Sequence, residues 1–404
     1  MKSSSPPIFL NRTTAPNITT LILLAGISAL AMNIFLPSLP GMAQYFDVDY
    51  SFMQLSVALY LAGNGILQIF IGPLADKYGR RPIVLWGTGL FCLATIGCIL
   101  SESGVVFMVF RVLQSVIAVA IVLSRAVVRD MYPPEKAASM MGYVTMGMSL
   151  VPMLAPAVGG YLETFYGWHA SFEVLLACGF ALFVLCWLDM GETAQPTTNT
   201  LTQQFGEYPE LLTSPRFWGY ALASAFCSGA FFAYLGGAPY IGTQVFGMSP
   251  EELGLYFATP GIGYFFGNFI SGLFSARIGP KRMVLIGTIF VTTAVSATLV
   301  LSFMGFSAPW LFFGVMIFVG IGNGMTIPNA TVGMLSVRPH LAGTASGLGS
   351  TLMIGGGALL SALAGMLLTE GSTERPLLAL MSITSALAVV SILAVIKRDK
   401  RLGY

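Results

Sequence analysis

The sequence predicts an all-α integral membrane protein whose twelve transmembrane helices form two six-helix halves. Three observations predict it: the composition, the recurrence of long apolar runs, and the placement of the basic residues. Of the 404 residues, 55% are hydrophobic and 9% are charged, and the mean hydropathy is +0.80. A soluble domain could not cover so much apolar surface with so few charges. The runs are long and continuous, unlike the short alternating strands of a β-barrel.

Each predicted span is an apolar run that ends at a polar or charged break and is long enough to cross a hydrocarbon layer of about 30 Å. In chain order the spans are 18–39, 52–73, 82–101, 105–127, 139–161, 171–190, 217–239, 251–273, 283–304, 308–328, 343–368 and 376–396. The first run has no small-residue cleavage site that ends it early. We therefore expect it to be kept as a helix rather than removed as a signal peptide.

The longest polar segment lies between the sixth and seventh spans and divides the chain. Its beginning, from Thr193 to Gln204, is rich in Thr, Gln and Pro, which is typical of a linker. The predicted organisation follows from this division. It comprises a cytoplasmic N-terminal tail 1–17, an N-terminal six-helix half 18–190, a cytoplasmic linker 191–215, a C-terminal six-helix half 216–396 and a cytoplasmic C-terminal tail 397–404.

The basic residues predict the orientation in the membrane. With the N-terminus in the cytoplasm, 17 of the 19 lysines and arginines fall at or near the cytoplasmic face. Only Arg375 faces outward, and Arg111 lies within a span. Because cytoplasmic loops carry an excess of Lys and Arg, both termini are predicted to be cytoplasmic.

Two charged segments at equivalent places indicate an internal duplication. Gly72–Pro82, between the second and third spans, reads GPLADKYGRRP, with four charges and two glycines. Gly272–Arg282, between the eighth and ninth spans, reads GLFSARIGPKR and keeps the glycine spacing and the basic residues. Ala276 stands where Asp76 would be. A six-plus-six duplication is the simplest interpretation.

The composition also limits cofactors and partners. The net charge of +2 carries no nucleic-acid signal, and the five cysteines match no metal-binding spacing. We find no Walker A sequence and no haem pattern, so no cofactor or metal is expected. The energy source is then an ion gradient or the flow of substrate itself. The expected partners are a small-molecule substrate and the lipid bilayer.

Five segments resemble the major facilitator superfamily. Gly72–Arg81 is similar to its cytoplasmic loop between helices 2 and 3, Phe110–Gln114 to its helix 4 arginine pattern, and Pro152–Gly160 to the helix 5 pattern of antiporters. Leu30–Pro40, with Ser124–Tyr132, resembles the bicyclomycin/chloramphenicol-resistance branch of twelve-helix drug–proton antiporters.

The resemblance implies a secondary active transporter, not an enzyme. Such a protein exports small amphipathic, drug-like molecules by proton antiport with alternating access, as a monomer in the bacterial inner membrane. An exporter of a native metabolite, such as a siderophore, amino acid or sugar derivative, is the alternative on the same fold, and it need not be proton-coupled. A receptor-like protein without transport and a channel are the further alternatives.

The motifs do not identify the residue that would carry the coupled proton. The branch commonly has an aspartate where this chain has Asn33, which cannot titrate, and no Asp or Glu lies near the middle of a predicted span. The remaining candidates lie near span ends or in an outer loop. They are Glu163, His169, Glu173 and Asp189.

The predicted substrate and coupling cavity centres on Arg111. A guanidinium within a bilayer is costly unless it is paired or hydrated, so it usually marks a functional site; an arginine that reaches the outer headgroups is the alternative. Counting along the helices places Asn33 at nearly the same depth as Arg111, with Gln114 one turn deeper. The other predicted cavity residues are Tyr60, Asn64 and Gln68, which share one helix face, and Met32, Phe231 and Tyr234.

The predicted cytoplasmic gate consists of Gly72, Asp76, Gly79, Arg80 and Asp130. Asp76 can approach the N-terminus of the eleventh helix near Ala342, and Arg80 can pair with Asp130 at the end of the fourth helix. The glycines permit a tight turn and a close helix approach. A charge cluster that only sets membrane orientation is the alternative.

The predicted exporter motif of the fifth helix consists of Pro152, Pro156, Gly159 and Gly160. Proline removes a backbone hydrogen bond, and glycine lets a neighbouring backbone come close. We therefore expect this helix to bend or to pack tightly against a neighbour.

Overall fold

The computed structural model describes residues 7–132, 134–194, 208–338, 342–369 and 371–402, and all regular structure within these ranges is helical. The first half contains α1 (Ile18–Asn33), α2 (Leu39–Tyr45), α3 (Tyr50–Tyr78), α4 (Arg80–Ile99), α5 (Gly104–Leu113), α6 (Ala118–Met131), α7 (Pro134–Tyr166) and α8 (Trp168–Asp189). Short 3-10 turns, Leu36–Ser38 and Gln114–Ile117, join α1 to α2 and α5 to α6.

The second half contains α11 (Pro215–Tyr240), α12 (Pro250–Tyr256), α13 (Thr259–Ile278), α14 (Pro280–Phe303), α15 (Pro309–Leu335), α16 (Ala342–Leu367) and α17 (Arg375–Leu402). A π-helical turn, Ile241–Val245, extends α11. A short helix, α10 (Tyr208–Leu212), lies within the predicted linker.

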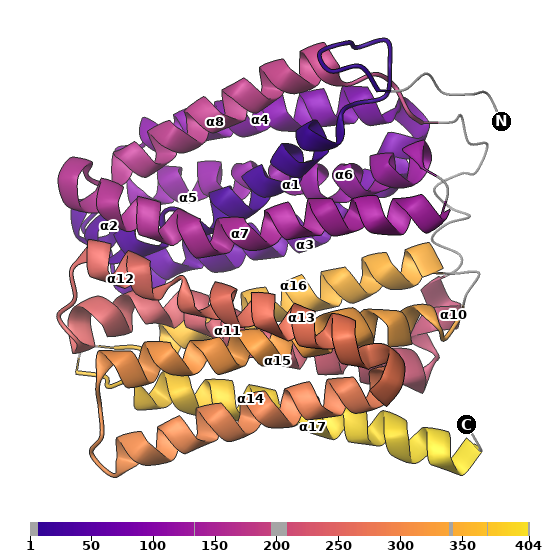
Figure 1. Ribbon diagram of the computed structural model, residues 1–404. Coiled ribbons are helices and arrows are strands. Elements are labelled where there is room, and N and C mark those ends of the chain that lie inside the picture. Colours follow the sequence, from indigo (N-terminus) through magenta and orange to yellow (C-terminus); the bar gives the residue numbers. More distant parts are fainter. Residues whose placement is uncertain (1–6, 133, 195–207, 339–341, 370, 403–404) are drawn as a thin grey trace.

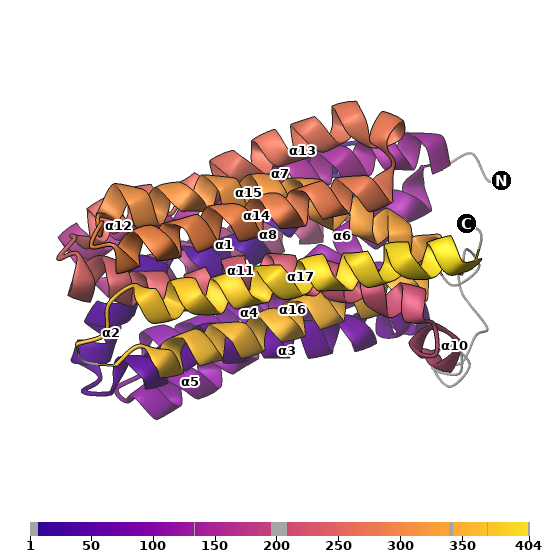
Figure 2. The same ribbon diagram turned by 90° about the horizontal axis from the view of Figure 1, so that it is seen from below.

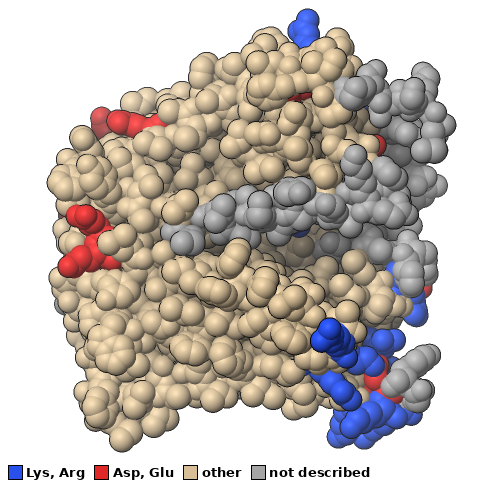
Figure 3. Space-filling view, in the orientation of Figure 1, with Lys and Arg blue, Asp and Glu red and all other residues tan. Residues whose placement is uncertain are grey.

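The helices form two groups that lie side by side along a common long axis. Figure 1 shows α1 to α8 above and α11 to α17 below, and Figure 2 gives the view from below. Both described chain ends lie at the same end of the molecule, which we call the terminal end, and the other is the far end. Lys and Arg gather at the terminal end in Figure 3, and Asp and Glu are prominent at the far end. This charge separation agrees with the predicted orientation.

Ten helices in the described ranges are long and apolar enough to cross a membrane. Each matches a predicted span. The other two predicted spans correspond to α7 and to α12 with α13, which are rich in glycine and proline. The all-α membrane fold predicted from the sequence is confirmed.

Three spans are less regular than continuous apolar runs suggest. Span 1 is broken after Asn33, where Pro37 and Pro40 begin new turns. Span 4 passes through a 3-10 turn at Gln114–Ile117. Span 8 is interrupted between α12 and α13, just before Pro260. Proline lacks a backbone donor, so it favours a new helix start over continuation.

A carboxylate at the end of each half joins the last helix to the first. At the end of α8, Asp189 accepts hydrogen bonds from the Asn17 amide (2.8 Å) and the Thr20 hydroxyl (2.6 Å) at the start of α1. At the end of α17, Asp399 pairs with Arg216 at the start of α11 (3.1 Å) and with Lys281 at the start of α14. Both acids are buried.

The glycines of α7 permit the close approach that the sequence predicts there. A Cβ at Gly159 would overlap the carbonyl oxygen of Ile34, and one at Gly160 would overlap the carbonyl oxygen of Pro250 in the other half. Pro156 lies within the continuous helix, and its carbonyl oxygen lies against Gly254 of α12. The fifth helix thus packs tightly on α1 and on the second half.

We expect Gly159→Ala to destabilise the protein because the added methyl group meets backbone, which cannot move aside cheaply. Overpacking of this kind costs about 1–3 kcal/mol. Gly272→Ala is the control, since nothing lies within 4 Å of a Cβ added there. Thermal unfolding in detergent should show a lower midpoint for Gly159→Ala alone. Equal midpoints for the two variants would contradict the close approach.

Candidate functional site

Arg111 lies fully buried in the first half, at the C-terminal end of α5. Its guanidinium stacks between the rings of Phe35 and Tyr60, with its central carbon 4.2 Å from each ring centroid. The guanidinium also makes two hydrogen bonds: Nη1 donates to Oε1 of Gln114 (2.8 Å), and Nη2 donates to the carbonyl oxygen of Ala31 (2.9 Å). This burial excludes the alternative in which Arg111 reaches the headgroups.

A chain of side-chain hydrogen bonds continues from Arg111 to α4. Gln114 Nε2 donates to the Thr95 hydroxyl (2.8 Å), and the Thr95 hydroxyl donates to the carbonyl oxygen of Phe91 (2.7 Å). Gln114 and Thr95 are fully buried. The Gln114 amide is therefore fixed, and its oxygen is oriented toward the guanidinium.

The break at the end of α1 explains how a buried cation is tolerated. The last four carbonyl groups of a helix have no partner within it and carry partial negative charge. α1 ends at Asn33, so the Ala31 carbonyl belongs to this last turn, and Arg111 supplies its donor. The faces of Phe35 and Tyr60 add cation–π attraction. In the described residues, no carboxylate pairs with Arg111.

The predicted contact between Arg111 and Asn33 is not present. Asn33 Nδ2 donates instead to the carbonyl oxygen of Ala29, one turn back on α1 (2.7 Å). Arg111, on α5, bonds to the carbonyl of Ala31, two residues before Asn33, but the Asn33 side chain does not take part in that contact. Asn33 faces a cavity between the halves, and Arg111 reaches the peptide carbonyl beside it.

The central cavity lies between the two halves and has a volume of about 230 Å³. Both halves contribute polar and charged side chains to its wall: Asn33 and Arg125 from the first, and Ser228, Tyr264 and Asn323 from the second. The rest of the described wall is mainly aromatic, aliphatic, Pro and Gly: Pro152, Phe231, Phe232, Leu235, Phe257, Pro260, Gly261, Gly320, Ile327 and Met353. Such a mixture is typical of small-molecule sites.

The predicted cavity residues separate into three groups. Asn33 and Phe231 line the cavity. Tyr60 belongs to the Arg111 site, and Asn64 accepts a hydrogen bond from Gln68 on α3 (2.7 Å). Tyr60, Asn64 and Gln68 are not part of the described cavity wall.

Met32 and Tyr234 form the third group and pack in the core. Tyr234 is fully buried against Phe257, Phe312 and Phe313 of the second half, and Met32 is partly buried against the main core cluster. Neither residue is part of the described cavity wall, so their predicted role in substrate binding stays a prediction.

Contacts between the halves close the far end of the cavity. The Tyr50 hydroxyl donates to the carbonyl oxygen of Gly236 (2.7 Å), and Gln54 Nε2 donates to the Ser361 hydroxyl (2.9 Å). The close approach of Gly160 to Pro250 lies in the same region. The described ion pairs at the terminal end, by contrast, join residues within one half or reach the linker helix α10.

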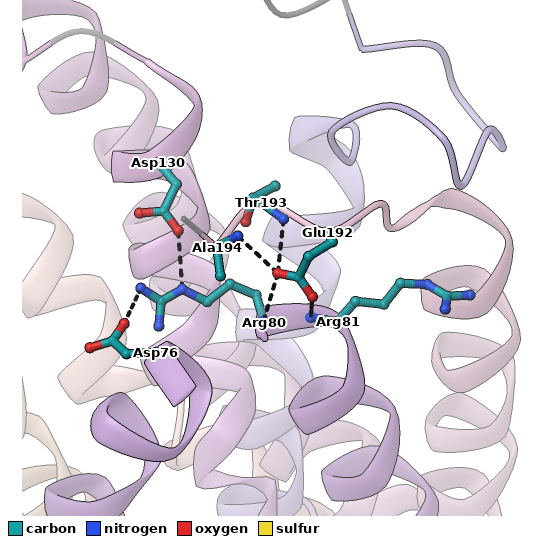
Figure 4. A network of polar contacts seen from close by, with 7 residues as sticks. All are labelled: Asp76, Arg80, Arg81, Asp130, Glu192, Thr193 and Ala194. Atoms are coloured by element: carbon teal, nitrogen blue, oxygen red, sulfur yellow. Dashed lines mark hydrogen bonds and ion pairs between the residues drawn. The ribbon is translucent and has the colours of Figure 1, made fainter. Parts of the chain in front are cut away.

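The charged cluster that the sequence singles out lies at the terminal end (Figure 4). Arg80 is nearly buried; it pairs with Asp76 on the preceding helix (2.6 Å) and with Asp130 at the end of α6 (3.0 Å). The ion pair between Arg80 and Asp130 that the sequence predicts is therefore present. Arg80 thereby joins the ends of the second, third and fourth spans.

Glu192 completes this cluster, although sequence reasoning did not select it. Its carboxylate accepts hydrogen bonds from the backbone amides of Arg80 (2.8 Å) and Arg81 (3.2 Å) at the start of α4. It also accepts from Thr193 (3.0 Å) and Ala194 (2.8 Å). A carboxylate favours a helix N-terminus, where amide groups lack partners. The beginning of the linker is therefore attached to the charged cluster.

The two glycines of the predicted gate behave differently. Gly79 makes the tight turn between α3 and α4 with a φ of +97°, as expected. Gly72 lies inside α3 with open space around it, so the close approach predicted there is not found. Residues 339–341 and the side chains at the start of the eleventh helix, at Ala342 and Gly343, are outside the described part of the chain, so the contact of Asp76 with this helix start stays a prediction.

The four candidate coupling residues lie outside the described cavity wall. Asp189 is bound to the start of α1. Glu173 lines an apolar groove between α4 and α8, and the His169 ring stacks on Trp168. Glu163 is half-buried at the far end of α7, next to Gly41. Glu163 follows Gly160, which approaches Pro250 of the other half, by three residues on α7.

Comparison with known proteins identifies the family. A model described as Major Facilitator Superfamily matches residues 21–362 and 238–402. The chain belongs to the major facilitator superfamily. The bicyclomycin resistance protein homolog of Haemophilus influenzae is 29% identical, over 93% of this chain and 94% of that protein. The chloramphenicol resistance protein of Pseudomonas aeruginosa is 30% identical, over 85% and 81%.

Solved structures confirm the major facilitator fold. A crystal structure of the peptide transporter POT in complex with sulfate matches with a TM-score of 0.78 at 15% identity, covering 96% of this chain and 94% of that one. The named relatives place this major facilitator protein in the bicyclomycin/chloramphenicol-resistance branch, as the sequence motifs predicted.

Proposed function

We propose that this major facilitator protein exports small amphipathic, drug-like molecules by alternating access. The observation that carries the proposal is the cavity between the halves, closed at the far end by contacts between them. Its largely apolar wall with a few polar groups suits an amphipathic substrate. Relatives named for bicyclomycin and chloramphenicol resistance support antibiotics as substrates.

In this proposal the terminal end faces the cytoplasm of a bacterium, and the protein spans the inner membrane as a monomer. The concentration of Lys and Arg at that end supports the orientation. The cluster of Asp76, Arg80 and Asp130, with Gly72 and Gly79, then serves as the cytoplasmic gate, and Glu192 ties the linker to it. Pro152, Pro156, Gly159 and Gly160 let the fifth helix pack at the surface along which the halves move.

Proton antiport is the proposed energy source, with no bound cofactor. Asn33 cannot carry the proton, and the described cavity wall contains no carboxylate. Glu163 is the candidate we favour, because it lies half-buried beside α2 near the far-end contacts. A metabolite exporter without proton coupling is the second candidate, and the missing cavity carboxylate is the observation that favours it.

Inverted membrane vesicles test the proposal. With an imposed pH gradient, acid inside, we expect uptake of labelled chloramphenicol against its gradient and loss of that uptake when an ionophore collapses the pH difference. Vesicles without the protein are the control. Flux that persists without a gradient would indicate a facilitator, and no flux with any of a panel of antibiotics would overturn drug export.

A further inference from the structure

We propose that the central cavity binds molecules with a negative charge more tightly than neutral or positive molecules of the same shape, and that Arg125 binds that charge. The inference deepens the proposed function and depends on it. It assigns a preferred substrate class, amphipathic organic anions, to a cavity whose shape alone would admit molecules of any charge.

Arg125 is placed differently from the arginines that form ion pairs. Arg80, Arg216 and Arg338 each pair with a carboxylate at 2.6–3.1 Å. Arg125, on α6, lines the cavity wall, and its side chain keeps an exposed surface there. No ion pair to Arg125 is found in the described part of the chain.

The described cavity wall therefore carries a positive charge that no acidic side chain in it balances. The described wall contains one cation, Arg125, and neither Asp nor Glu. Tyr264 of α13 lines the same cavity from the second half. A guanidinium in an apolar surrounding attracts an anion more strongly than it would in water, because charges are less screened there. A cationic molecule would meet repulsion and no compensating carboxylate.

The neighbouring groups fit an anion with an aromatic or aliphatic body. The side-chain amide of Asn323 can donate a hydrogen bond to a carboxylate or sulfonate whose other oxygen faces Arg125. Phe231 and Phe257 provide apolar contact for the rest of the molecule. Because the polar side chains come from both halves, a bound anion would contact both of them at once.

Binding of three probes with the same ring tests the inference. Radiolabelled 2-naphthoate, 2-naphthamide and (2-naphthylmethyl)trimethylammonium are negative, neutral and positive, respectively. Binding is measured by scintillation proximity to the full chain in phosphatidylcholine nanodiscs, with empty nanodiscs subtracted. We expect naphthoate to bind about tenfold more tightly than the amide, as a charge-assisted hydrogen bond predicts, and the cation to bind least.

Arg125→Gln should remove the preference for naphthoate over the amide, and Arg125→Lys should keep part of it. Arg282→Gln is the control, because Arg282 is an exposed residue outside the cavity wall, and its binding profile should match the unmodified protein. Equal thermal midpoints would show that the Arg125 variants fold.

Four results would overturn the inference: equal binding of acid and amide, preference for the cation, binding of none of the probes, or a naphthoate preference that survives Arg125→Gln. Loss of naphthoate binding in nanodiscs containing phosphatidylglycerol would assign the site to a lipid headgroup rather than to a soluble anion. If the protein still exports drugs along a pH gradient but shows no preference for the anionic probe, only this inference is overturned. Loss of all export would overturn the proposed function.

Discussion

Arg111→Ala is expected to reduce drug export to the level of cells that lack the protein. The substitution removes the cation between Phe35 and Tyr60 and leaves the Ala31 carbonyl and the Gln114 oxygen without a donor. Each buried group left unpaired costs about 1–3 kcal/mol, so the end of α1 should also rearrange. That end carries Asn33, which lines the cavity. The measurement is drug accumulation in an efflux-deficient strain, together with the amount of protein in the membrane.

Arg111→Lys separates charge from geometry at the same site. Lysine keeps the positive charge but lacks the planar group that stacks on two rings and donates in two directions, so we expect little recovery of export. Thr95→Val is the milder control, because it removes only the distant hydroxyl of the hydrogen-bond chain. Normal export by Arg111→Ala at normal membrane levels would show that the buried arginine has no part in transport.

Asp76→Asn is expected to abolish export while the protein still folds and reaches the membrane. The amide keeps the shape of the side chain but weakens the pair with Arg80, which then has only Asp130. Asp76 and Asp130 keep side-chain exposures of 26% and 19%, and partly exposed pairs contribute about 0–1 kcal/mol to stability. The thermal midpoint should therefore change little. A large effect on transport with a small effect on stability is what a gate requires.

An exposed ion pair away from the gate provides the matched control for Asp76. Glu210 of α10 pairs with Arg338 at 2.7 Å, and both side chains are nearly half exposed. Glu210→Gln removes a comparable charge and should leave export unchanged. If Asp76→Asn also exports normally, the cluster sets membrane orientation only.

Counting along the apolar runs predicted that Arg111 lies beside the end of α1, and its bond to the Ala31 carbonyl agrees with this. The same counting predicted a contact between Arg111 and Asn33, which does not form. The partner of Arg111 is the carbonyl of Ala31, and no side-chain pattern reveals which backbone groups a helix end leaves unpaired. The same limit explains Arg125: its charge is visible in the sequence, whereas its rotation toward the cavity depends on how the helices pack.

The charged loop was easier to predict, because charges in so apolar a chain have few places to lie. The proximity of Arg80 to Asp130 follows from placing both helix ends at one membrane face. Glu192 was missed because it stands at the start of a segment that reads as a linker. In the sequence Glu192 is only a single acid after the sixth span. Such acids are too common for the sequence to predict which helix N-terminus this one would cap.

The acids that end the two halves affect how the molecule can move. Asp189 joins α8 to the start of α1, and Asp399 joins α17 to the start of α11. In each half the last helix is thereby fastened to the first, so that the helices form a closed cycle of contacts in place of an open row. A closed cycle has no edge helix that can slide away alone. Deformation is then expected to concentrate at the surface between the two cycles, where close glycine contacts and single hydrogen bonds connect them.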